Sequence, residues 1–535
     1  MPLNLTRRQF ARAGAAASLA ALLPRGVVGN TSSAKKVAIH ADREIGLVRP
    51  EFHSHFAEHL GSCVYGGIWV GPKSPVENVN GFRKAAVDYL KELGVPVLRW
   101  PGGCFADDYH WREGIGPKRP KRVNIHWGNY IEDNSFGTHE FIAFCRLIGA
   151  EPYFAANVGT GSPQEMRDWI EYCNFPSGSA LADERAANGS PEPFRVKYWG
   201  VGNELWGCGG NMTPQQAALE FRRFASFART FGDTRLYLVG CGPNGNDARW
   251  TRGFMDTLAD TRLRPQGYSF HFYENGTMPP DHFTPEAMYQ QFNIFPRVEQ
   301  AVVEQRALLD TYDPARRMGL ILDEWGVWDR IPASDEQRNG RLWQQSTMRS
   351  AIGAALGLNL FNRQADKLYM CNIAQMVNVL QSVLLTDGPE SPKCVRTTTY
   401  HAFMLFKPHR GKTAVHVEAD GNRLPEPGVG PGRGMQQQAP PPDLSVSASR
   451  QEGVLAISFV NPRHDVDMDV DCALHGFSGR SGRAQILHDP DLNAANGFDA
   501  PDRITVKPHE VTVEGGRVRL HLPAMSVATV TVQAG

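Results

Sequence analysis

Two glutamate residues stand directly after short apolar runs that have the character of buried strands. Glu204 comes soon after Lys197–Gly202, and Glu324 follows Gly319–Asp323. Two carboxyl groups facing one pocket can act together on a glycosidic bond: one protonates the leaving oxygen and the other attacks the anomeric carbon. Because burying a carboxyl group without a function is costly, the pattern predicts Glu204 and Glu324 as a catalytic pair.

The two carboxyl groups need different environments. The proton donor must hold its proton near neutrality, while the nucleophile must stay ionised, helped by a nearby cation such as Arg99. Carboxyl groups about 5 Å apart predict retention through a covalent glycosyl-enzyme, whereas a gap of about 6.5–9.5 Å predicts inversion.

Between residues 50 and 395, short apolar runs alternate with amphipathic stretches, a pattern typical of repeated βα units around a parallel sheet. The helices include Gly81–Leu93 and Pro214–Thr230, the second opening on Thr213 as a cap. The eight apolar runs are Phe52–Ala57, Val97–Trp100, Tyr153–Val158, Val196–Val201, Leu236–Gly240, Tyr268–Phe272, Leu320–Leu322 and Leu368–Ile373. Eight such units close a (β/α)8 barrel, so the predicted fold class is α/β, a TIM barrel.

Active sites of such barrels lie at the carboxyl ends of the strands. The polar or aromatic residues found just after the runs are Glu58, His59, Arg99 to Cys104, Asn203, Glu204, His271, Tyr273, Asp323 to Trp325 and Gln375. We therefore expect these side chains to surround one pocket. Trp100, Trp111 and Trp325 are candidates for sugar platforms, and core packing is an equally good interpretation for them.

After residue 395 the pattern changes to strict alternation, as in Val454–Val460 and Arg517–Leu522. This predicts a C-terminal antiparallel β-sandwich over residues 396–535, with a Pro- and Gly-rich insertion at 425–442. The barrel is expected over residues 50–395. Residues 34–49 contain a strand without a helix of its own, which we expect to join the sandwich.

The charge composition of the chain indicates which kinds of binding partner suit it. Lys and Arg total 56, as do Asp and Glu, so no net charge draws the chain to nucleic acid, and a neutral polar substrate suits it better. Thr6–Phe10 contains an arginine pair and precedes the apolar run Ala13–Leu23. This pattern predicts a twin-arginine export signal over residues 1–33 and a periplasmic or secreted protein, with no association with a membrane.

The nine cysteines form no CxxC pairs, so the sequence suggests neither a zinc cage nor a dense disulfide framework. An odd count leaves at least one unpaired. We expect most of them to be small buried apolar residues.

The sequence resembles glycoside hydrolase family 51, the α-L-arabinofuranosidases, from about residue 36 to 415 and weakly beyond. The segments that carry the resemblance are Phe56–Gly61, Tyr65–Trp69, Arg99–Phe105, Trp111–Pro117, Asn134–Phe141, Trp199–Trp206 and Asp323–Trp328. The resemblance implies a retaining enzyme that removes terminal arabinofuranosyl residues from oligosaccharides or polysaccharides. The two-carboxyl chemistry needs no cofactor and no metal, and the resemblance suggests a homo-oligomer.

The resemblance also implies a role for each matching residue. Glu204 matches the acid/base, Glu324 the nucleophile and Asn203 the amide that holds the sugar 2-hydroxyl. The expected binding residues are Glu58 and Gln375 on sugar hydroxyls, Arg99 and Tyr273 beside the nucleophile, and His271, Trp127 and Cys104 in the pocket wall. Glu58 and Gln375 have an alternative interpretation as buried residues that hold the loops, and plain packing is an equally good interpretation for Cys104.

Three rival functions stay open on the sequence alone. His53 and His55, with His271 and Asp323, resemble the ligand set of a metal-dependent amidohydrolase, although Asn203 and Glu204 occupy the place of its bridging lysine. A catalytically silent carbohydrate-binding protein would keep the barrel without using the carboxyl groups. A β-glycosidase or endoglucanase on the same barrel is the nearest alternative enzyme.

Overall fold

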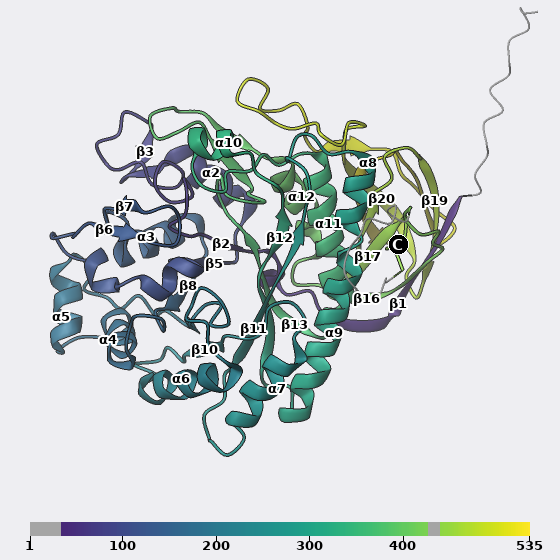
Figure 1. Ribbon diagram of the computed structural model, residues 1–535. Helices are drawn as coiled ribbons and strands as arrows, with labels where there is room; N and C mark the ends of the chain where they lie inside the picture. Colours follow the sequence, from purple (N-terminus) through teal and green to yellow (C-terminus); the bar gives the residue numbers. More distant parts are fainter. Residues whose placement is uncertain (1–33, 426–438) are drawn as a thin grey trace, which may run out of the picture. The chain divides into compact units, whose positions relative to one another are not determined.

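The computed structural model describes residues 34–425 and 439–535, so the expected export signal and most of the 425–442 insertion lie outside the described residues. Eight parallel strands close into a barrel (Figure 1), which confirms the predicted TIM barrel. In barrel order the strands are β10 (Tyr237–Gly240), β11 (Gly267–Asn275), β12 (Gly319–Trp328), β13 (Leu368–Ala374), β2 (Ser54–Phe56), β5 (Val97–Trp100), β8 (Glu151–Ala156) and β9 (Tyr198–Val201). Each strand overlaps one of the eight apolar runs, and β11 and β12 extend several residues beyond theirs.

Helices surround this barrel. They are α2 (Lys84–Leu93), α3 (Thr138–Ile148), α4 (Pro163–Asn174), α5 (Ala180–Ala187), α6 (Pro214–Phe227), α7 (Ala248–Thr257), α8 (Pro285–Phe292), α9 (Phe295–Tyr312), α10 (Ala333–Asn339), α11 (Met348–Arg363) and α12 (Thr398–Phe406). Helix α6 begins as the sequence predicts: Thr213 and Gln216 cap each other's backbone N–H groups, and Pro214 occupies the first turn.

Short elements shape the loops at both ends of the barrel. The 3-10 helices are η1 (Pro50–His53), η2 (Cys104–Asp108), η3 (Trp111–Gly114) and η4 (Lys407–His409). The small hairpins are β3 (Asn78–Val79) with β4 (Phe82–Arg83), β6 (Arg122–Asn124) with β7 (Tyr130–Glu132), and β14 (Leu384–Thr386) with β15 (Cys394–Arg396).

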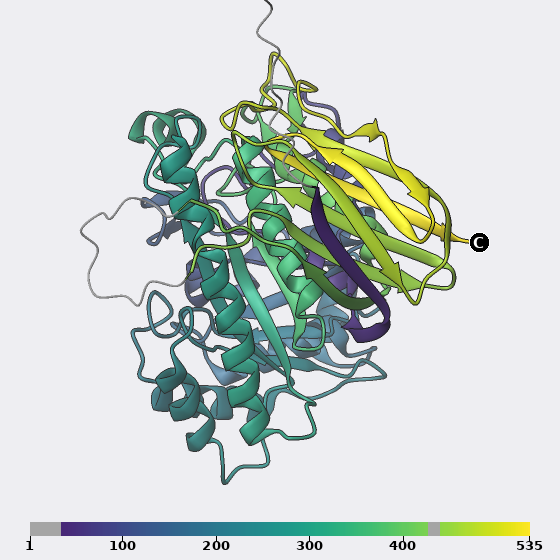
Figure 2. The same cartoon turned by 90° about the vertical axis from the view of Figure 1, so that its right-hand side faces the viewer.

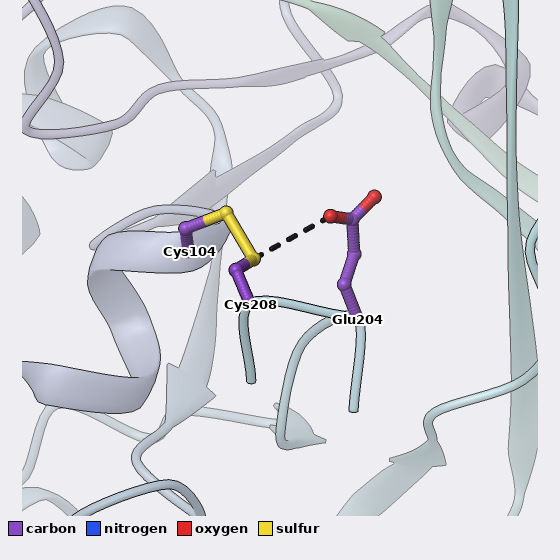
Figure 3. Close-up of side chains that lie close together, drawn as sticks. All are labelled: Cys104, Glu204 and Cys208. Atoms are coloured by element: carbon purple, nitrogen blue, oxygen red, sulfur yellow. Dashed lines mark hydrogen bonds between the residues drawn. A yellow bond between two sulfur atoms is a disulfide. The ribbon is translucent and has the colours of Figure 1, made fainter. Parts of the chain in front are cut away.

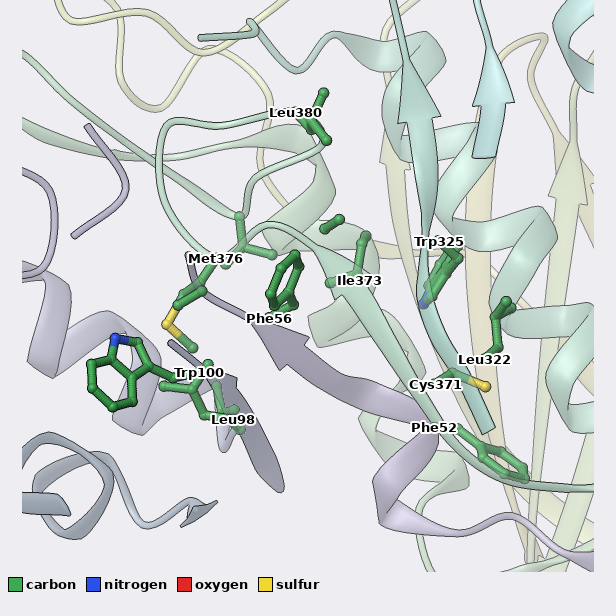
Figure 4. Close-up of a cluster of buried hydrophobic side chains, with 14 of the residues drawn as sticks. Phe52, Phe56, Leu98, Trp100, Leu322, Trp325, Cys371, Ile373, Met376 and Leu380 are labelled. Atoms are coloured by element: carbon green, nitrogen blue, oxygen red, sulfur yellow. The ribbon is translucent and has the colours of Figure 1, made fainter. Parts of the chain in front are cut away.

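Apolar side chains fill both sides of the barrel wall. Figure 4 shows part of the outer packing, in which Phe52, Leu322 and Trp325 lie near one another. A second cluster, from six strands, packs separately from the first; its buried members are Val97, Tyr153, Tyr198, Val239, Ile321 and Met370. Since side chains alternate along a strand, Val97 shares its face with Arg99, and Ile321 with Asp323. This apolar cluster therefore forms the floor on which the polar residues stand.

Nine C-terminal strands and β1 (Lys35–Leu47) form a ten-stranded sheet, so the predicted C-terminal β domain is present and the strand within residues 34–49 joins it. Its order is β21 (Lys507–His509), β20 (Gly479–His488), β24 (Ser526–Ala534), β18 (Val454–Asn461), β17 (Ser445–Gln451), β16 (Thr413–Ala419), β1, β19 (Met468–His475), β23 (Arg517–Leu522) and β22 (Thr512–Glu514). Strand β1, purple in Figure 2, pairs antiparallel with β16 and parallel with β19. The sheet is therefore mixed at this strand rather than wholly antiparallel.

Helix α11 joins the barrel to this sheet through buried hydrogen bonds. The Asn359 amide donates to the Ser445 carbonyl over 3.1 Å, and the Asn362 amide donates to the Ser447 hydroxyl over 3.0 Å. Because unpaired amides at such a buried contact would be costly, these pairs fix the helix against β17. No helix among the described residues has the length and apolar character that crossing a membrane requires.

We predict that Leu322→Ala lowers the free energy of unfolding by about 2–5 kcal/mol, because its fully buried side chain leaves a cavity in the barrel wall. Urea denaturation followed by circular dichroism measures the change. Leu219→Ala is the matched control: this leucine of α6 is 39% exposed, and its loss changes stability by no more than about 0.5 kcal/mol. Equal effects of the two substitutions would contradict the assigned core.

Candidate active site

The two candidate carboxyl groups meet at the carboxyl ends of the barrel strands, with His271 between them. Glu204 follows β9, Glu324 belongs to β12 and His271 belongs to β11. The Nδ1 atom of His271 lies 2.9 Å from Glu204 Oε1 and 3.5 Å from Glu324 Oε2. One ligand atom from each of the three side chains lies within 4.8 Å of the other two. The sequence-predicted pair is thus brought to one point.

Glu324 is surrounded by donors. Arg99 Nη1 donates to its Oε1 over 2.8 Å, and the Tyr273 hydroxyl donates to its Oε2 over 2.7 Å. Burial opposes ionisation, but the charges of His271 and Arg99 and these hydrogen bonds outweigh it, so the pKa of Glu324 lies below its ordinary value. This carboxyl group is therefore held as an anion.

A β-bulge brings two consecutive acidic residues to Arg99. Phe270 pairs with Leu322 but His271 pairs with Glu324, so the register shifts at Asp323. In a regular strand, neighbouring side chains point to opposite faces. At a bulge, two consecutive side chains can point to the same side. Asp323 lies 3.5 Å from Arg99 Nε and accepts hydrogen bonds from the Tyr153 hydroxyl and the Asn372 amide. Asp323 thus helps to hold the guanidinium that faces Glu324.

Glu204 has a more open position than Glu324. Its side chain is 18% exposed, against 7% for Glu324. The backbone of Glu204 has φ +42°, a left-handed conformation that costs an L residue free energy and is often found at functional sites. His271, which contacts Glu204, is buried; burial lowers its pKa, but Glu324 and Glu204 more than compensate, so the net shift is upward. A cationic ring therefore suits the space between the two carboxyl groups.

Glu58 forms a second polar cluster in the pocket. Its Oε1 accepts hydrogen bonds from the Phe105 backbone N–H over 3.1 Å and from the Trp127 indole over 3.0 Å, and its Oε2 accepts from the Gln375 amide over 3.0 Å. Burial and the charge of Glu324 raise the pKa of Glu58 to about 7 despite these donors. A Cβ at Gly102 would lie 2.6 Å from Glu58 Cγ, so only glycine leaves room there.

Asn203 belongs to the group around Glu324, which it joins through Arg99. Its Oδ1 accepts a hydrogen bond from Arg99 Nη2 over 2.5 Å. Within the described part of the chain, its buried Nδ2 has no partner, and neither does Gln375 Oε1. Unsatisfied buried polar atoms are rare in proteins, so these two atoms are available to the hydroxyl groups of a ligand.

Asp107 is a functional residue that the sequence analysis missed. Its buried carboxyl group accepts hydrogen bonds from the backbone N–H groups of Val158, Gly159 and Asn203, at 2.8, 3.1 and 2.8 Å. It thereby ties the loop after β5 to the loops after β8 and β9. The sequence signal for Asp107 was only its position shortly after the second strand. Its partners are backbone N–H groups, which every residue type except proline carries, so the sequence does not identify them.

Cys104 contributes to the pocket wall through a disulfide that the sequence analysis did not identify. Its sulfur is bonded to Cys208, with the two Cα atoms 5.5 Å apart. Figure 3 shows this disulfide beside Glu204. Of the seven free cysteines in the described residues, six are buried and Cys394 is partly buried, so the expectation of mostly buried cysteines holds for them.

The remaining candidates lie away from the pocket. Trp100, Trp111 and Trp325 are at most 1% exposed and pack against other aromatic rings, so core packing describes them and sugar stacking does not. His53 and His55 pack on Phe403 of α12, outside the barrel. His59 is buried against Glu132 and receives a hydrogen bond from the Trp100 indole. The ligand set of an amidohydrolase is therefore not assembled.

A groove of about 700 Å³ opens beside Glu204. Its other lining residues are Trp206, Asn244, Gly245, Asn246, Phe272, Tyr273, Asn275, Ile294, Arg297, Gln300 and Trp328. Glu204 lines this groove and Glu324 does not. The groove therefore offers space on the side of the site that faces Glu204.

Comparison with known proteins identifies relatives along most of the chain. Family models described as the α-L-arabinofuranosidase 1 domain and the α-L-arabinofuranosidase C-terminal domain match residues 89–291 and 323–526. An intracellular exo-α-L-arabinofuranosidase of Bacteroides ovatus is 37% identical, covering 96% of this chain and 98% of its own. A probable α-L-arabinofuranosidase C of Aspergillus fumigatus is 33% identical over 83% of this chain and 87% of its own.

Solved structures of α-L-arabinofuranosidases also resemble this chain. The family 51 arabinofuranosidase of Xanthomonas axonopodis pv. citri is 37% identical, with a TM-score of 0.87 over 94% of this chain and 100% of that one. The arabinose complex of the Thermotoga maritima α-L-arabinofuranosidase is 29% identical, with a TM-score of 0.80 over 93% and 100% of the two chains.

The barrel and these relatives define a glycoside hydrolase that removes α-L-arabinofuranosyl residues. More narrowly, the chain belongs to glycoside hydrolase family 51, the α-L-arabinofuranosidases, as its sequence motifs indicate.

The expectation of a periplasmic or secreted protein is wrong by the same comparison. The Bacteroides ovatus relative, aligned over 96% of this chain, is named an intracellular enzyme. An arginine pair before a short apolar run is a pattern of a few residues, and the rest of the chain neither supports nor opposes it. The alignment, in contrast, compares nearly the whole chain.

We predict that Glu58→Gln stabilises the protein relative to the wild type as the pH rises from 5 to 8. A carboxyl group whose pKa is raised to about 7 opposes folding once the pH exceeds its unfolded value, because the folded state disfavours the charge. Glutamine stays neutral, so the difference in melting temperature should grow by a few degrees across this range. Differential scanning calorimetry measures it, with the exposed Glu514→Gln as control. A difference independent of pH would contradict the assignment.

Proposed function

We propose that this enzyme is a retaining exo-acting α-L-arabinofuranosidase, in which Glu204 is the general acid/base and Glu324 is the nucleophile. Its substrates are arabinose-containing plant oligosaccharides or polysaccharides. The observation that carries the proposal is the short separation of the two carboxyl groups: an oxygen of Glu204 and an oxygen of Glu324 lie within 4.8 Å. Such a gap leaves no room for the water molecule that an inverting mechanism places between substrate and base.

In the first step, Glu324 attacks the anomeric carbon while Glu204 protonates the glycosidic oxygen. The bond between the anomeric carbon and that oxygen breaks, and the leaving group departs as an alcohol. Arg99 and Tyr273 keep Glu324 ionised and aimed, since their hydrogen bonds occupy both of its oxygens. The more exposed Glu204 suits proton transfer because it also borders the groove that would receive the leaving group.

In the second step, Glu204, now ionised, takes a proton from water, and the resulting oxygen attacks the anomeric carbon. Glu324 leaves and arabinose is released with its original anomeric configuration. His271 is a positioning residue for both carboxyl groups, because its Nδ1 atom lies between them.

The sugar is held by the polar atoms that surround the two carboxyl groups. The free Nδ2 of Asn203 and Oε1 of Gln375 supply a donor and an acceptor, and Glu58 supplies carboxyl oxygens. Gly103 makes room, since a Cβ there would lie 3.0 Å from Glu324 Oε1. A small ring with several hydroxyl groups matches this combination of acceptors, donors and space.

We predict that Glu204→Ala loses roughly 100-fold or more in hydrolysis of unactivated arabinofuranosides, because no group protonates the leaving oxygen. With an activated aryl arabinofuranoside, sodium azide should restore turnover about ten-fold or more, since the small anion needs no base. NMR of the product should show an arabinofuranosyl azide of retained configuration.

Glu324→Ala is the matched variant. Azide would then displace the aryl group directly from the opposite face and give the inverted azide. If Glu324→Ala gave the retained azide and Glu204→Ala the inverted azide, the two roles would be exchanged. Either result alone would contradict the proposed role of that residue. The wild-type reaction should release arabinose with retention, and an inverted product would rule out the covalent intermediate.

The groove beside Glu204 supports an oligosaccharide as the leaving group. It contains the aromatic rings of Trp206, Phe272 and Trp328 together with several asparagine side chains. Aromatic faces pack on sugar rings, and amides hydrogen-bond to hydroxyl groups. We therefore infer that sugars beyond the scissile bond lie along this groove.

We predict that Trp206→Ala lowers kcat/KM for a linear arabino-oligosaccharide roughly ten-fold, which corresponds to about 1.4 kcal/mol of lost stacking. For methyl α-L-arabinofuranoside, whose leaving group is too small to reach the ring, kcat/KM should change by less than about two-fold. Phe227→Ala, which removes an exposed ring of α6, serves as control. Equal losses on both substrates would mean that Trp206 shapes the pocket itself and not the groove.

A further inference from the structure

Two cysteines from different loops meet beside Glu204. Cys104 begins η2 after β5, and Cys208 lies four residues after Glu204. Both side chains are partly exposed, so a small molecule can reach the disulfide that joins them. The dashed line in Figure 3 joins Cys208 Sγ to Glu204 Oε2, which lie 3.5 Å apart. Because a sulfur in a disulfide carries no proton, this contact becomes a donated hydrogen bond only after reduction.

Reduction would turn this cluster into a set of metal ligands. One ligand atom from each of Cys104, Cys208 and Glu204 lies within 4.8 Å of the other two. Two thiolates and a carboxylate are ligands that Zn²⁺ and the softer Cd²⁺ accept, with water completing four-coordination. A disulfide leaves its sulfurs without the charge that binds such a cation.

The other ligand group at this site is less suited to these cations. Glu204, His271 and Glu324 also have ligand atoms within 4.8 Å of one another, but this group offers only nitrogen and oxygen. Arg99 is bonded to Glu324, so a dication there would face a fixed positive charge. Among the described residues, no arginine is ion-paired with the sulfur-containing group. Its Glu204 contacts His271, but an imidazole ring, unlike a guanidinium, can lose its proton when a dication binds.

We propose that reduced Cys104 and Cys208, together with Glu204, form a binding site for a thiophilic divalent cation, and that the disulfide closes this site. A dithiol reductant supplies two electrons and two protons: its own sulfurs become a disulfide, and the Cys104–Cys208 bond becomes two thiols. On binding the cation, the two thiols release their protons to solvent.

Occupation of this site would stop hydrolysis, because the cation takes the oxygen of Glu204 that must carry the proton. The part of this inference that concerns activity rests on the role proposed for Glu204. The binding of the cation does not, since it depends only on the three ligands. The residues that hold the sugar, such as Glu58 and Gln375, are not ligands of this site.

The test uses the full-length enzyme and CdCl2 as the probe. One sample is reduced with dithiothreitol and desalted without oxygen, and the other is kept oxidised. The reduced enzyme should bind one Cd²⁺ per chain, with the ultraviolet charge-transfer absorbance of thiolate bound to cadmium. Its hydrolysis of an aryl arabinofuranoside should fall roughly 100-fold, the scale of a lost acid/base, and should return on chelation. The oxidised enzyme should show neither change.

Matched variants separate this site from the other cysteines. Reduced Cys208→Ser should lose the absorbance and the inhibition, each compared with its own cadmium-free state. Reduced Cys394→Ser removes the partly buried free thiol outside the site and should retain both. Equal inhibition of the oxidised enzyme, or an unchanged absorbance in Cys208→Ser, would overturn the site. If reduced enzyme showed the cadmium–thiolate absorbance but hydrolysed the substrate as fast as before, the cation site would be confirmed. The proposed role of Glu204 would then be wrong.

Discussion

The guanidinium of Arg99 is buried beside Glu324, and the polar groups around that carboxyl group depend on it. It bonds to Glu324 and Asn203 and lies 3.5 Å from Asp323. A buried charge is stable only where opposite charges and hydrogen bonds compensate it. Asp323 and Glu324 provide that compensation. The ring of His271, whose pKa Glu324 and Glu204 raise against the opposing effect of burial, lies 3.5 Å from Glu324. Without Arg99, Asp323 and Glu324 would face each other with no cation between them.

The barrel makes this arrangement possible by bringing distant residues to one end. Its strands run parallel, so their carboxyl ends meet although Arg99 and Glu324 are 225 residues apart. Beneath them, Val97 and Ile321 belong to a cluster of buried apolar side chains. Charges interact more strongly where water is excluded. The bulge at Asp323 then directs two successive carboxyl groups to the same cation.

The loops above the floor are held by contacts of a different kind. Asp107 binds three backbone N–H groups, and burial raises the pKa of its carboxyl group to about 7 despite those bonds. The Cys104–Cys208 disulfide crosses the same space and joins loops 104 residues apart. Both contacts connect the loop after β5 with the loop that carries Glu204. The position of Glu204 therefore depends on two ties outside its own strand, one of them chemically reversible.

The sequence by itself determined the barrel and the positions where its chemistry had to lie. Strands buried on both faces read as continuous apolar runs, so all eight were recognisable, and the polar residues after them included Glu204, Glu324 and Arg99. These are local properties, which a chain displays before it folds. The arginine pair near the N-terminus was equally local and led to a wrong expectation about location, because nothing else in the chain constrained it.

Only the tertiary structure decided how these residues contact one another. Asp107 acts on backbone groups, the disulfide joins two of nine scattered cysteines, and a bulge sets the direction of Glu324. Trp100, Trp111 and Trp325, which sequence left between core and sugar platform, were assigned to the core by their burial. Each of these features depends on which distant segments become neighbours. That choice is made when the barrel closes, and a pattern of residue types along the chain does not contain it.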